Sequence, residues 1–174
     1  LYKQNAIRSK HQKQFDNINE FLRSLEMESE VGPVSEVYLP RFTQLINKSN
    51  QFHLTTTRYT ETQVRSMIDD NMTTLRYFRL KDSFGDNGLI SALIIKRQSE
   101  ILVIDTWVMS CRVLSRGMEE FICSEIISIA KCLKSTIVRG KYLPSKKNKL
   151  ASSLYERLGF KLIKKEPDGT SYWE

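Results

Sequence analysis

The sequence predicts a mixed α/β domain in which helices flank one central sheet. Its 174 residues, 40% hydrophobic and 27% charged, are ordinary for one globular domain with a sizeable core. Apolar residues alternate in the middle of the chain and then recur at helical spacing after position 117. After an N-terminal helix, the expected order of elements is β, α, α, β, β, β, α, β, α, β, β.

The first 26 residues are expected to form a linker helix from a missing upstream domain, ahead of the domain proper at 27–174. The stretch 3–25 is polar with a sparse apolar stripe that includes Ile18 and Phe21. Such a stripe is typical of a helix with one packed face. The chain also opens with Leu1 rather than Met, as an excised piece of a longer protein would.

Alternating or β-branched runs bounded by turn residues predict the strands. The expected strands are 26–33, 75–80, 89–95, 101–109, 136–143, 160–163 and 171–173. The three consecutive strands from position 75 predict a meander, with a two-glycine turn at 84–88 between the first two. The last two strands bracket a Pro-Asp-Gly turn at 167–169 and predict a closing hairpin.

Helical spacing of apolar residues predicts four helices within the domain. These are 41–48, 60–68, 118–133 and 148–158. Pro40 favours the first turn of a helix, and Thr60 and Gln63 have the spacing of a capping box. Gly159 is a natural terminator for the last helix. The connection 51–58 is expected to be a loop.

The junction between the strand 101–109 and the helix 118–133 is a candidate phosphate site. Unpaired amides at a helix start, together with the helix dipole, bind phosphate without any particular side chain. Gly117 lacks a Cβ, so an oxyanion can approach the backbone, and Arg112 and Arg116 add positive charge. Strand–loop–helix junctions with a glycine are also common without any ligand, so this segment alone leaves both interpretations open.

A second segment favours the functional interpretation. Asn148 and Tyr155 are seven residues apart in the expected last helix, so both would face one side of it. Together the two segments resemble the GNAT superfamily of acyltransferases. Its pyrophosphate motif, Gln/Arg-x-x-Gly-x-Gly/Ala, is met by Arg112, Ser115 and Gly117, with serine at the first glycine position. Its Asn-x-x-Ala-x-x-x-Tyr-x-x-x-Gly-Phe ending is met by Asn148, Ala151, Tyr155, Gly159 and Phe160.

This resemblance implies the GNAT fold, a central mixed, mostly antiparallel sheet of about six to seven strands flanked by helices, here with an extra N-terminal helix. It also implies that acyl-CoA, or the phosphopantetheine thioester of an acyl carrier protein, binds along the strand end and the loop. The Cβ of Ser115 either fits the loop or crowds the pyrophosphate. The expected contacts are Val108, Met109, Ser110, Arg112, Val113, Leu114, Ser115, Arg116, Gly117, Met118 and Asn148.

A closer resemblance covers nearly the whole chain. The stretches 50–59, 82–88 and 105–112 look like the C-terminal part of FkbH-like proteins, in which a haloacid-dehalogenase-type domain precedes a GNAT-like domain. That family is associated with loading a glyceryl unit from a bisphosphoglycerate onto an acyl carrier protein, toward methoxymalonyl-type polyketide extender units. No Asp-x-Asp phosphatase motif occurs here, so the chain resembles the second domain alone. An acyl carrier protein and the upstream domain are the implied partners.

Two side chains are candidates for catalysis. By the resemblance, Tyr155 would protonate the departing thiolate, or it would fill the edge of the core. Cys111, at a helix start beside two arginines, would accept the acyl group as a thiolate, or it would be a small buried hydrophobe. No metal site is expected, because three cysteines and two histidines match no common zinc spacing.

The loop 51–58 is expected to line the acyl or acceptor side. His53 is a candidate general base or acyl-chain contact, although an exposed loop histidine is the interpretation we favour. Thr55, Thr56 and Arg58 would accompany it as substrate contacts. Asp105 is either a buried base or a strand residue facing solvent.

A second hypothesis is a non-catalytic module that keeps the GNAT fold to dock an acyl carrier protein for the upstream domain. Ser115 and the shortage of general bases favour it. A net charge of +7 suits phosphate-bearing partners, but no RNP-like pattern of aromatics predicts nucleic acid. No apolar run has transmembrane length and no signal peptide is visible. The odd cysteine count argues against a disulfide framework, so a cytoplasmic setting is expected.

Overall fold

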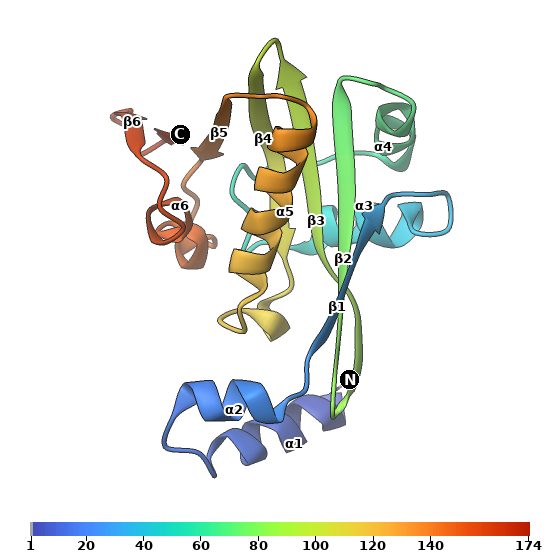
Figure 1. The fold of residues 1–174 in the computed structure, drawn as a ribbon, viewed down its shortest axis with the longest axis vertical. Coiled ribbons are helices and arrows are strands. Elements are labelled where there is room, and N and C mark those ends of the chain that lie inside the picture. Colours follow the sequence, from blue (N-terminus) through green and yellow to red (C-terminus); the bar gives the residue numbers. More distant parts are fainter. Residues whose placement is uncertain (1) are drawn as a thin grey trace.

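The computed structural model describes the backbone of residues 2–174 and the side chains of residues 6–8 and 10–174. Its centre is a seven-stranded sheet in the order β1-β2-β3-β4-β5-β7-β6 (Figure 1). The strands are β1 (Glu28–Pro33), β2 (Thr73–Asp82), β3 (Gly85–Gln98), β4 (Ile101–Met109), β5 (Ile137–Tyr142), β6 (Leu162–Lys165) and β7 (Ser171–Trp173). The pair β4–β5 is parallel and the other neighbouring pairs are antiparallel, which confirms the expected mixed, mostly antiparallel sheet.

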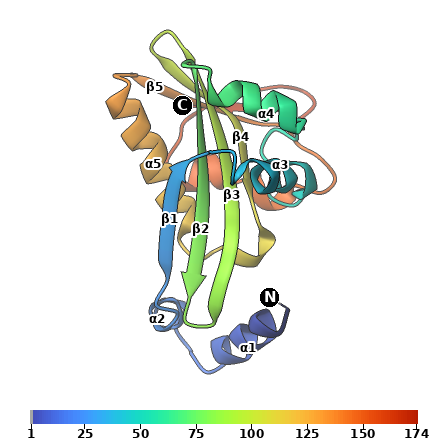
Figure 2. The same ribbon diagram turned by 90° about the vertical axis from the view of Figure 1, so that its right-hand side faces the viewer.

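Helices cover both faces of the sheet. α3 (Leu39–Lys48) and α4 (Glu61–Ile68) lie on one face, and α5 (Met118–Cys132) lies on the other (Figure 2). The two faces have separate apolar cores, one containing Phe42 and the other Trp107. Burial from both sides explains why the middle strands are nearly continuous apolar runs rather than strict alternations.

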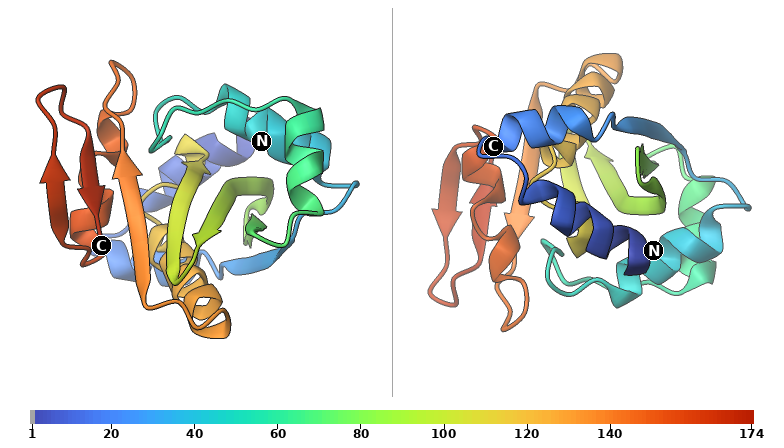
Figure 3. Two further views of the ribbon diagram at one scale, coloured as in Figure 1. Left: turned by 90° about the horizontal axis from the view of Figure 1, so that it is seen from above. Right: turned by 90° about the horizontal axis from the view of Figure 1, so that it is seen from below.

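Local signals placed α4 and the closing hairpin as expected. The Thr60 side chain accepts a hydrogen bond from the Gln63 amide, and the Gln63 side chain accepts one from the Thr60 amide, so the capping box is confirmed. β6 and β7 pair across the predicted turn and form the end of the sheet opposite β1 (Figure 3).

The N-terminal segment forms two helices, whereas one was expected. α1 (Tyr2–Gln12) and α2 (Ile18–Ser24) are separated because Asn17 starts a new helix, its side chain accepting the Asn19 amide at 2.8 Å. Both helices lie beyond one end of the sheet (Figure 1). A buried ion pair of 2.8 Å between Arg8 and Asp82 joins α1 to the β2–β3 hairpin.

The turn between β2 and β3 is tighter than predicted. β3 begins at Gly85, which pairs with Asp82, so the turn consists of residues 83 and 84. The expected turn residues Asp86 to Gly88 lie inside the strand, where register shifts interrupt the ladder and Gly88 has a φ of +68°. A bulge therefore absorbs a sequence that resembles a turn.

The predicted helix 148–158 is also broken in two. A 3-10 turn, η2 (Lys149–Ala151), precedes the four-residue α6 (Leu154–Arg157). Asn148 lies before both pieces, with its side chain committed to a neighbouring loop rather than to a helix. The expectation that Asn148 and Tyr155 share one helix face is therefore wrong.

Candidate functional site

The strands β4 and β5 part at the expected thioester site. Their pairing runs from Ile101 opposite Ile137 to Ile104 opposite Gly140. β4 continues to Met109 beyond the last of these pairs. The side of β4 that β5 leaves is where the thioester arm was expected to bind.

The chain's own segment Phe52 to Leu54 lies along this side of β4. The Met109 amide donates to the Phe52 carbonyl at 3.1 Å, and the Leu54 amide donates to the Trp107 carbonyl at 3.3 Å. The Leu54 carbonyl in turn accepts the Leu143 amide at 2.8 Å, just beyond β5. This gap segment therefore acts as a short strand between β4 and the end of β5. The β4 backbone groups expected to meet a thioester are already hydrogen-bonded.

Asn148 holds the gap segment in place. Its Nδ2 donates to the carbonyls of His53 and Leu143, both at 2.9 Å. Its Oδ1 accepts the Ser145 amide at 2.7 Å and the Tyr142 hydroxyl at 3.2 Å. The side chain is fully buried, with donors and acceptor both used inside the chain. This geometry makes Asn148 a brace for the loops around the gap.

His53 is buried, so the exposed loop histidine that we favoured is wrong. Its Nδ1 accepts the Thr56 amide at 3.1 Å and its Nε2 lies 2.9 Å from the Thr57 carbonyl, which fits the tautomer with hydrogen on Nε2. Burial, reinforced by the nearby Arg58, lowers the pKa of His53 to about 4. The ring is therefore neutral near pH 7 and stabilises its own loop.

The other residues that were expected to contact the substrate lie in different places. The Thr55 hydroxyl donates to the Asp105 carbonyl at 2.8 Å and is buried. Thr56 and Arg58 instead line a shallow cavity of about 290 Å³, together with Lys146 and Lys147. The Arg58 guanidinium also donates to the carbonyls of Ile46 and Ser49 and to Asn50 Oδ1, which fixes the end of α3.

Asp105 is an ion-pair partner. Its carboxylate accepts the Tyr59 hydroxyl and the Lys96 ammonium, each at 2.6 Å. The carboxylate thus belongs to one hydrogen-bonded network with Tyr59 and Lys96 on the α4 side of β4. Asp105 is therefore neither a buried base nor a strand residue that faces solvent.

Tyr155 lies at the vertex of the gap. Its ring occupies the space above Gly140, where an added Cβ would come within 2.3 Å of it. The hydroxyl is buried and makes no hydrogen bond of standard geometry within the described residues. Burial raises the pKa of this hydroxyl, and the nearby Lys141 backbone lowers it by less. Ring contacts with Phe160 and Trp173 complete the packing.

The predicted phosphate loop is formed by a 3-10 turn, η1 (Cys111–Val113), and the residues leading to α5. Ser115 and Gly117 both have left-handed φ values, +60° and +79°. This explains why glycine suits both positions. The amides of Arg116 and Gly117 carry no hydrogen bond within the described chain, whereas the Ser115 amide donates to Glu119 Oε1 at 3.1 Å. Glu119 is a buried carboxylate at the loop, and its other oxygen, Oε2, has no hydrogen-bond partner among the described residues.

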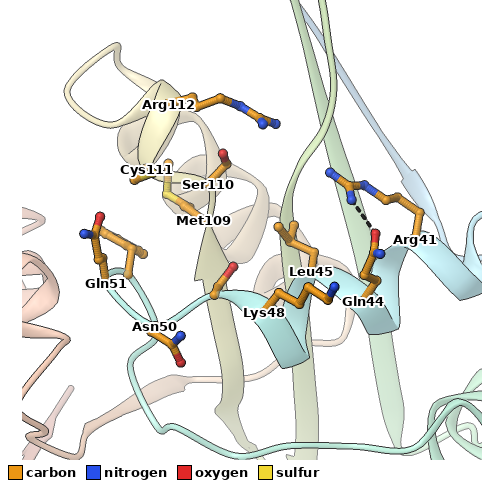
Figure 4. A pocket seen from close by; sticks show the side chains of 12 residues that line it. Arg41, Gln44, Leu45, Lys48, Asn50, Gln51, Met109, Ser110, Cys111 and Arg112 are labelled. Carbon is orange, nitrogen blue, oxygen red and sulfur yellow. Dashed lines mark hydrogen bonds between the residues drawn. The ribbon is translucent and has the colours of Figure 1, made fainter. Parts of the chain in front are cut away.

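Two adjoining cavities flank this loop. The thiol cavity, of about 410 Å³, lies between α3 and the end of β4 (Figure 4). It is lined by Arg41, Gln44, Leu45, Lys48, Ser49, Asn50, Gln51, Phe52, Met109, Ser110, Cys111 and Arg112. The loop cavity, of about 290 Å³, lies between the loop and the N-terminal helices. It is lined by Arg8, Gln12, Ile18, Phe21, Leu22, Arg112, Leu114, Ser115 and Arg116.

The predicted contact residues divide between these cavities and the core. Arg112 lines both cavities, and the Cys111 thiol is exposed rather than a buried hydrophobe. Arg116 is partly neutralised, because its guanidinium lies 3.3 Å from Asp82, which also pairs with Arg8. Three of the predicted contacts are buried in the apolar cores and line neither cavity: Val108, Val113 and Met118.

Three residues of the site were missed by sequence reasoning. Arg41 and Lys48 lie on α3, about seventy positions before Cys111 in the chain, and Glu119 lies in the first turn of α5. The seven-residue spacing of Arg41 and Lys48 places both on one helix face, which was a readable signal. No local sequence signal indicates which surface that face meets.

Solved N-acetyltransferases share this fold, while no family model and no curated protein match the chain. The ribosomal-protein-S18-alanine N-acetyltransferase of Escherichia coli has 12% identity and a TM-score of 0.59, over 84% of this chain and 90% of that one. The spermidine N-acetyltransferase of Vibrio cholerae, solved with CoA and spermine, has 13% identity and a TM-score of 0.61, over 83% and 92%. The GNAT domain of S. lividans PAT has 10% identity and a TM-score of 0.61, over 83% and 88%.

The chain therefore has the GNAT fold. At these identities the likeness establishes architecture, and function has to be argued from the site. No helix in the described part of the chain is long and apolar enough to cross a membrane.

Proposed function

We propose that this chain is an acyltransferase domain acting on a phosphopantetheine thioester, carried by CoA or by an acyl carrier protein. The observation that carries the proposal is the position of Cys111. Its exposed thiol lines the thiol cavity at the end of β4, next to a loop in which two amides have no hydrogen bond to the described part of the chain. A nucleophile beside a loop suited to an oxyanion is the arrangement that acyl transfer through a cysteine requires.

The two ends of the thioester fit the site differently. The phosphate-bearing end suits the loop cavity, which is lined by Arg112, Ser115 and Arg116 and lies beside the amides of residues 116 and 117. The pantetheine arm does not fit along Trp107 to Met109 while the gap segment is paired there. We therefore place the acyl end in the thiol cavity, with Arg112 between the two cavities.

Transfer through Cys111 would be a thioester exchange. The thiolate sulfur attacks the acyl carbonyl, the bond from that carbon to the carrier sulfur breaks, and the carrier leaves as a thiol after taking up a proton. Direct transfer would instead use Tyr155 as the acid for the leaving thiolate. That route requires the gap segment to open, because the Tyr155 hydroxyl is buried. Asn148, His53 and Thr55 would position the segment, and Thr56 and Arg58 would face the carrier.

We further propose an FkbH-like context, in which the domain serves a cytoplasmic glyceryl- or methoxymalonyl-type loading protein. An acyl carrier protein and an upstream haloacid-dehalogenase-type domain would be its partners. Support comes from the stretch 50–59, which carries much of the resemblance and contains the gap segment.

The second candidate is a non-catalytic module that docks an acyl carrier protein. Two observations favour it: the gap is filled by Phe52 to Leu54, and the Tyr155 hydroxyl is buried. A domain that only presents a carrier needs neither a free β4 edge nor an accessible acid.

Intact-mass spectrometry after incubation with acyl-CoA and with acyl-carrier protein tests the proposal. Transfer through Cys111 predicts an adduct of one acyl group that is lost in Cys111→Ala and kept in Cys132→Ala, the matched variant at the other exposed cysteine. Direct transfer predicts turnover that Tyr155→Phe reduces while the adduct is absent. Carrier-protein binding with no adduct and no turnover would favour the docking module.

A further inference from the structure

The charged side chains that line the thiol cavity are all basic among the described residues. Within that part of the chain, the lining of the cavity includes three basic side chains, Arg41 and Lys48 from α3 and Arg112 from beyond β4, and no aspartate or glutamate. Figure 4 shows the α3 side chains on one wall and Met109 to Arg112 on the other. Positive charges gathered on a concave surface concentrate the field within it.

These three cations form no ion pair with the described part of the chain. Other surface arginines are paired, such as Arg65 with Glu36 and Arg79 with Asp86. Within the described chain, Arg41, Lys48 and Arg112 have no carboxylate partner, and Arg41 donates only to its neighbour Gln44. The Arg112 Nε atom is buried and has no hydrogen-bond partner among the described residues. A buried guanidinium nitrogen left without an acceptor is costly unless a ligand supplies one.

We propose that the thiol cavity binds an oxyanion, a carboxylate or a phosphate, on a small group presented to Cys111. The inference deepens the proposed function, because it assigns a charge to the group that the site receives. A volume of about 410 Å³ is in the range of small-ligand sites. Arg112 and Arg41 supply planar donors suited to an oxyanion, and Lys48 supplies a point charge.

Alkylation of Cys111 tests this without any acyl transfer. Iodoacetate and iodoacetamide both react by attack of the thiolate on the CH₂ carbon with loss of iodide, but only iodoacetate carries a carboxylate. The fraction of Cys111 present as thiolate affects both reagents alike. The rate with iodoacetate divided by the rate with iodoacetamide therefore reports the charge around the thiol. Replacing Arg41 and Lys48 with Gln should lower the ratio at Cys111 roughly threefold per cation. Peptide mass spectrometry measures the ratio at each cysteine.

The control removes the same charge elsewhere. Lys146→Gln with Lys147→Gln lies outside the thiol cavity and should leave the Cys111 ratio unchanged. Cys132, exposed at the end of α5, should keep its ratio in every variant. Arg41 and Lys48 are exposed, so their variants should fold, as circular dichroism would verify.

A second arm identifies the anion. Inorganic phosphate or acetate is added at constant ionic strength, which is set with chloride. Either anion should slow alkylation of Cys111 and not of Cys132. The anion that slows it more shows whether the cavity prefers a phosphate or a carboxylate. The inference stands if the ratio falls in the α3 variant and either anion protects. An unchanged ratio, an equal fall in the control, or protection by neither anion would overturn it. A chain that transfers no acyl group can still show the lower ratio and the protection by an anion. Failure of this test is therefore distinguishable from failure of the proposed function.

Discussion

The Nδ2 of Asn148 donates to the main-chain carbonyl of His53 across 2.9 Å, joining positions 95 residues apart in the chain. This bond ties the gap segment to the loop that follows β5. Asn148, which matches a position of the GNAT superfamily motif, thus uses its side-chain amide to hold the gap closed where a thioester arm was expected.

Asn148→Ala should destabilise the domain by about 2–4 kcal/mol, because it leaves several buried backbone groups unpaired at once. It should also increase hydrogen exchange at the Leu54 and Met109 amides, which the gap segment protects. Urea denaturation and exchange mass spectrometry measure the two effects. Lys149→Ala, at the exposed neighbour, is the control and should change neither. Unaltered exchange in Asn148→Ala would contradict its role as a brace.

Acidification should weaken the domain through His53. Its pKa is lowered from 6.5 to about 4 on folding, so the unfolded chain binds more protons between these values. Stability contributed by the neutral ring is complete above about pH 6.5 and is lost as pH falls toward 4. Between about pH 7.5 and about pH 5 this costs roughly 2 kcal/mol.

Denaturation curves at the two pH values measure this loss. The matched variant is His53→Gln, which cannot titrate and should show a smaller pH dependence by that amount. Equal slopes for the variant and the parent chain would mean that burial of His53 does not depress its protonation.

Tyr155→Phe should stabilise the domain by about 0.5–1 kcal/mol, because it removes a buried hydroxyl that makes no hydrogen bond of standard geometry with any described residue. The matched variant is Tyr142→Phe, since the Tyr142 hydroxyl donates to Asn148 Oδ1 at 3.2 Å. Tyr142→Phe should therefore lose about 1 kcal/mol. Thermal or urea unfolding compares them, and a loss of stability in Tyr155→Phe would indicate a missed partner.

Substitutions at the two left-handed positions of the loop, Ser115 and Gly117, should affect the stability of the domain differently. Ser115→Gly relieves a left-handed backbone at φ +60° and should be neutral or stabilising by up to about 1 kcal/mol. Gly117→Ala forces a side chain into φ +79° and should cost about 1 kcal/mol, although an added Cβ would meet no atom within 4 Å. Calorimetry measures both. If Gly117→Ala is as stable as the parent chain, the loop is not strained as described.

Local sequence signals were sufficient where short-range geometry decides the outcome. The capping box of Thr60 and Gln63, the apolar runs of β3 and β4, and the turn before β7 formed as expected because their hydrogen bonds and side-chain periods involve near neighbours. The predictions for 84–88 and 148–158 were incomplete. There, pairing with β2 and the capture of Asn148 by distant carbonyls overrode the local preference.

By itself the sequence determined the order of elements from β1 onward, the mixed sheet, and the strand–loop–helix junction ending in Gly117. Tertiary structure alone decided that Phe52 to Leu54 pairs with β4, that His53 is buried, and that Arg41 and Lys48 line one cavity with Cys111. The physical reason is range. Secondary structure follows from periodicity over a few residues, whereas the charge and occupancy of a cavity depend on which distant segments the packed core brings together.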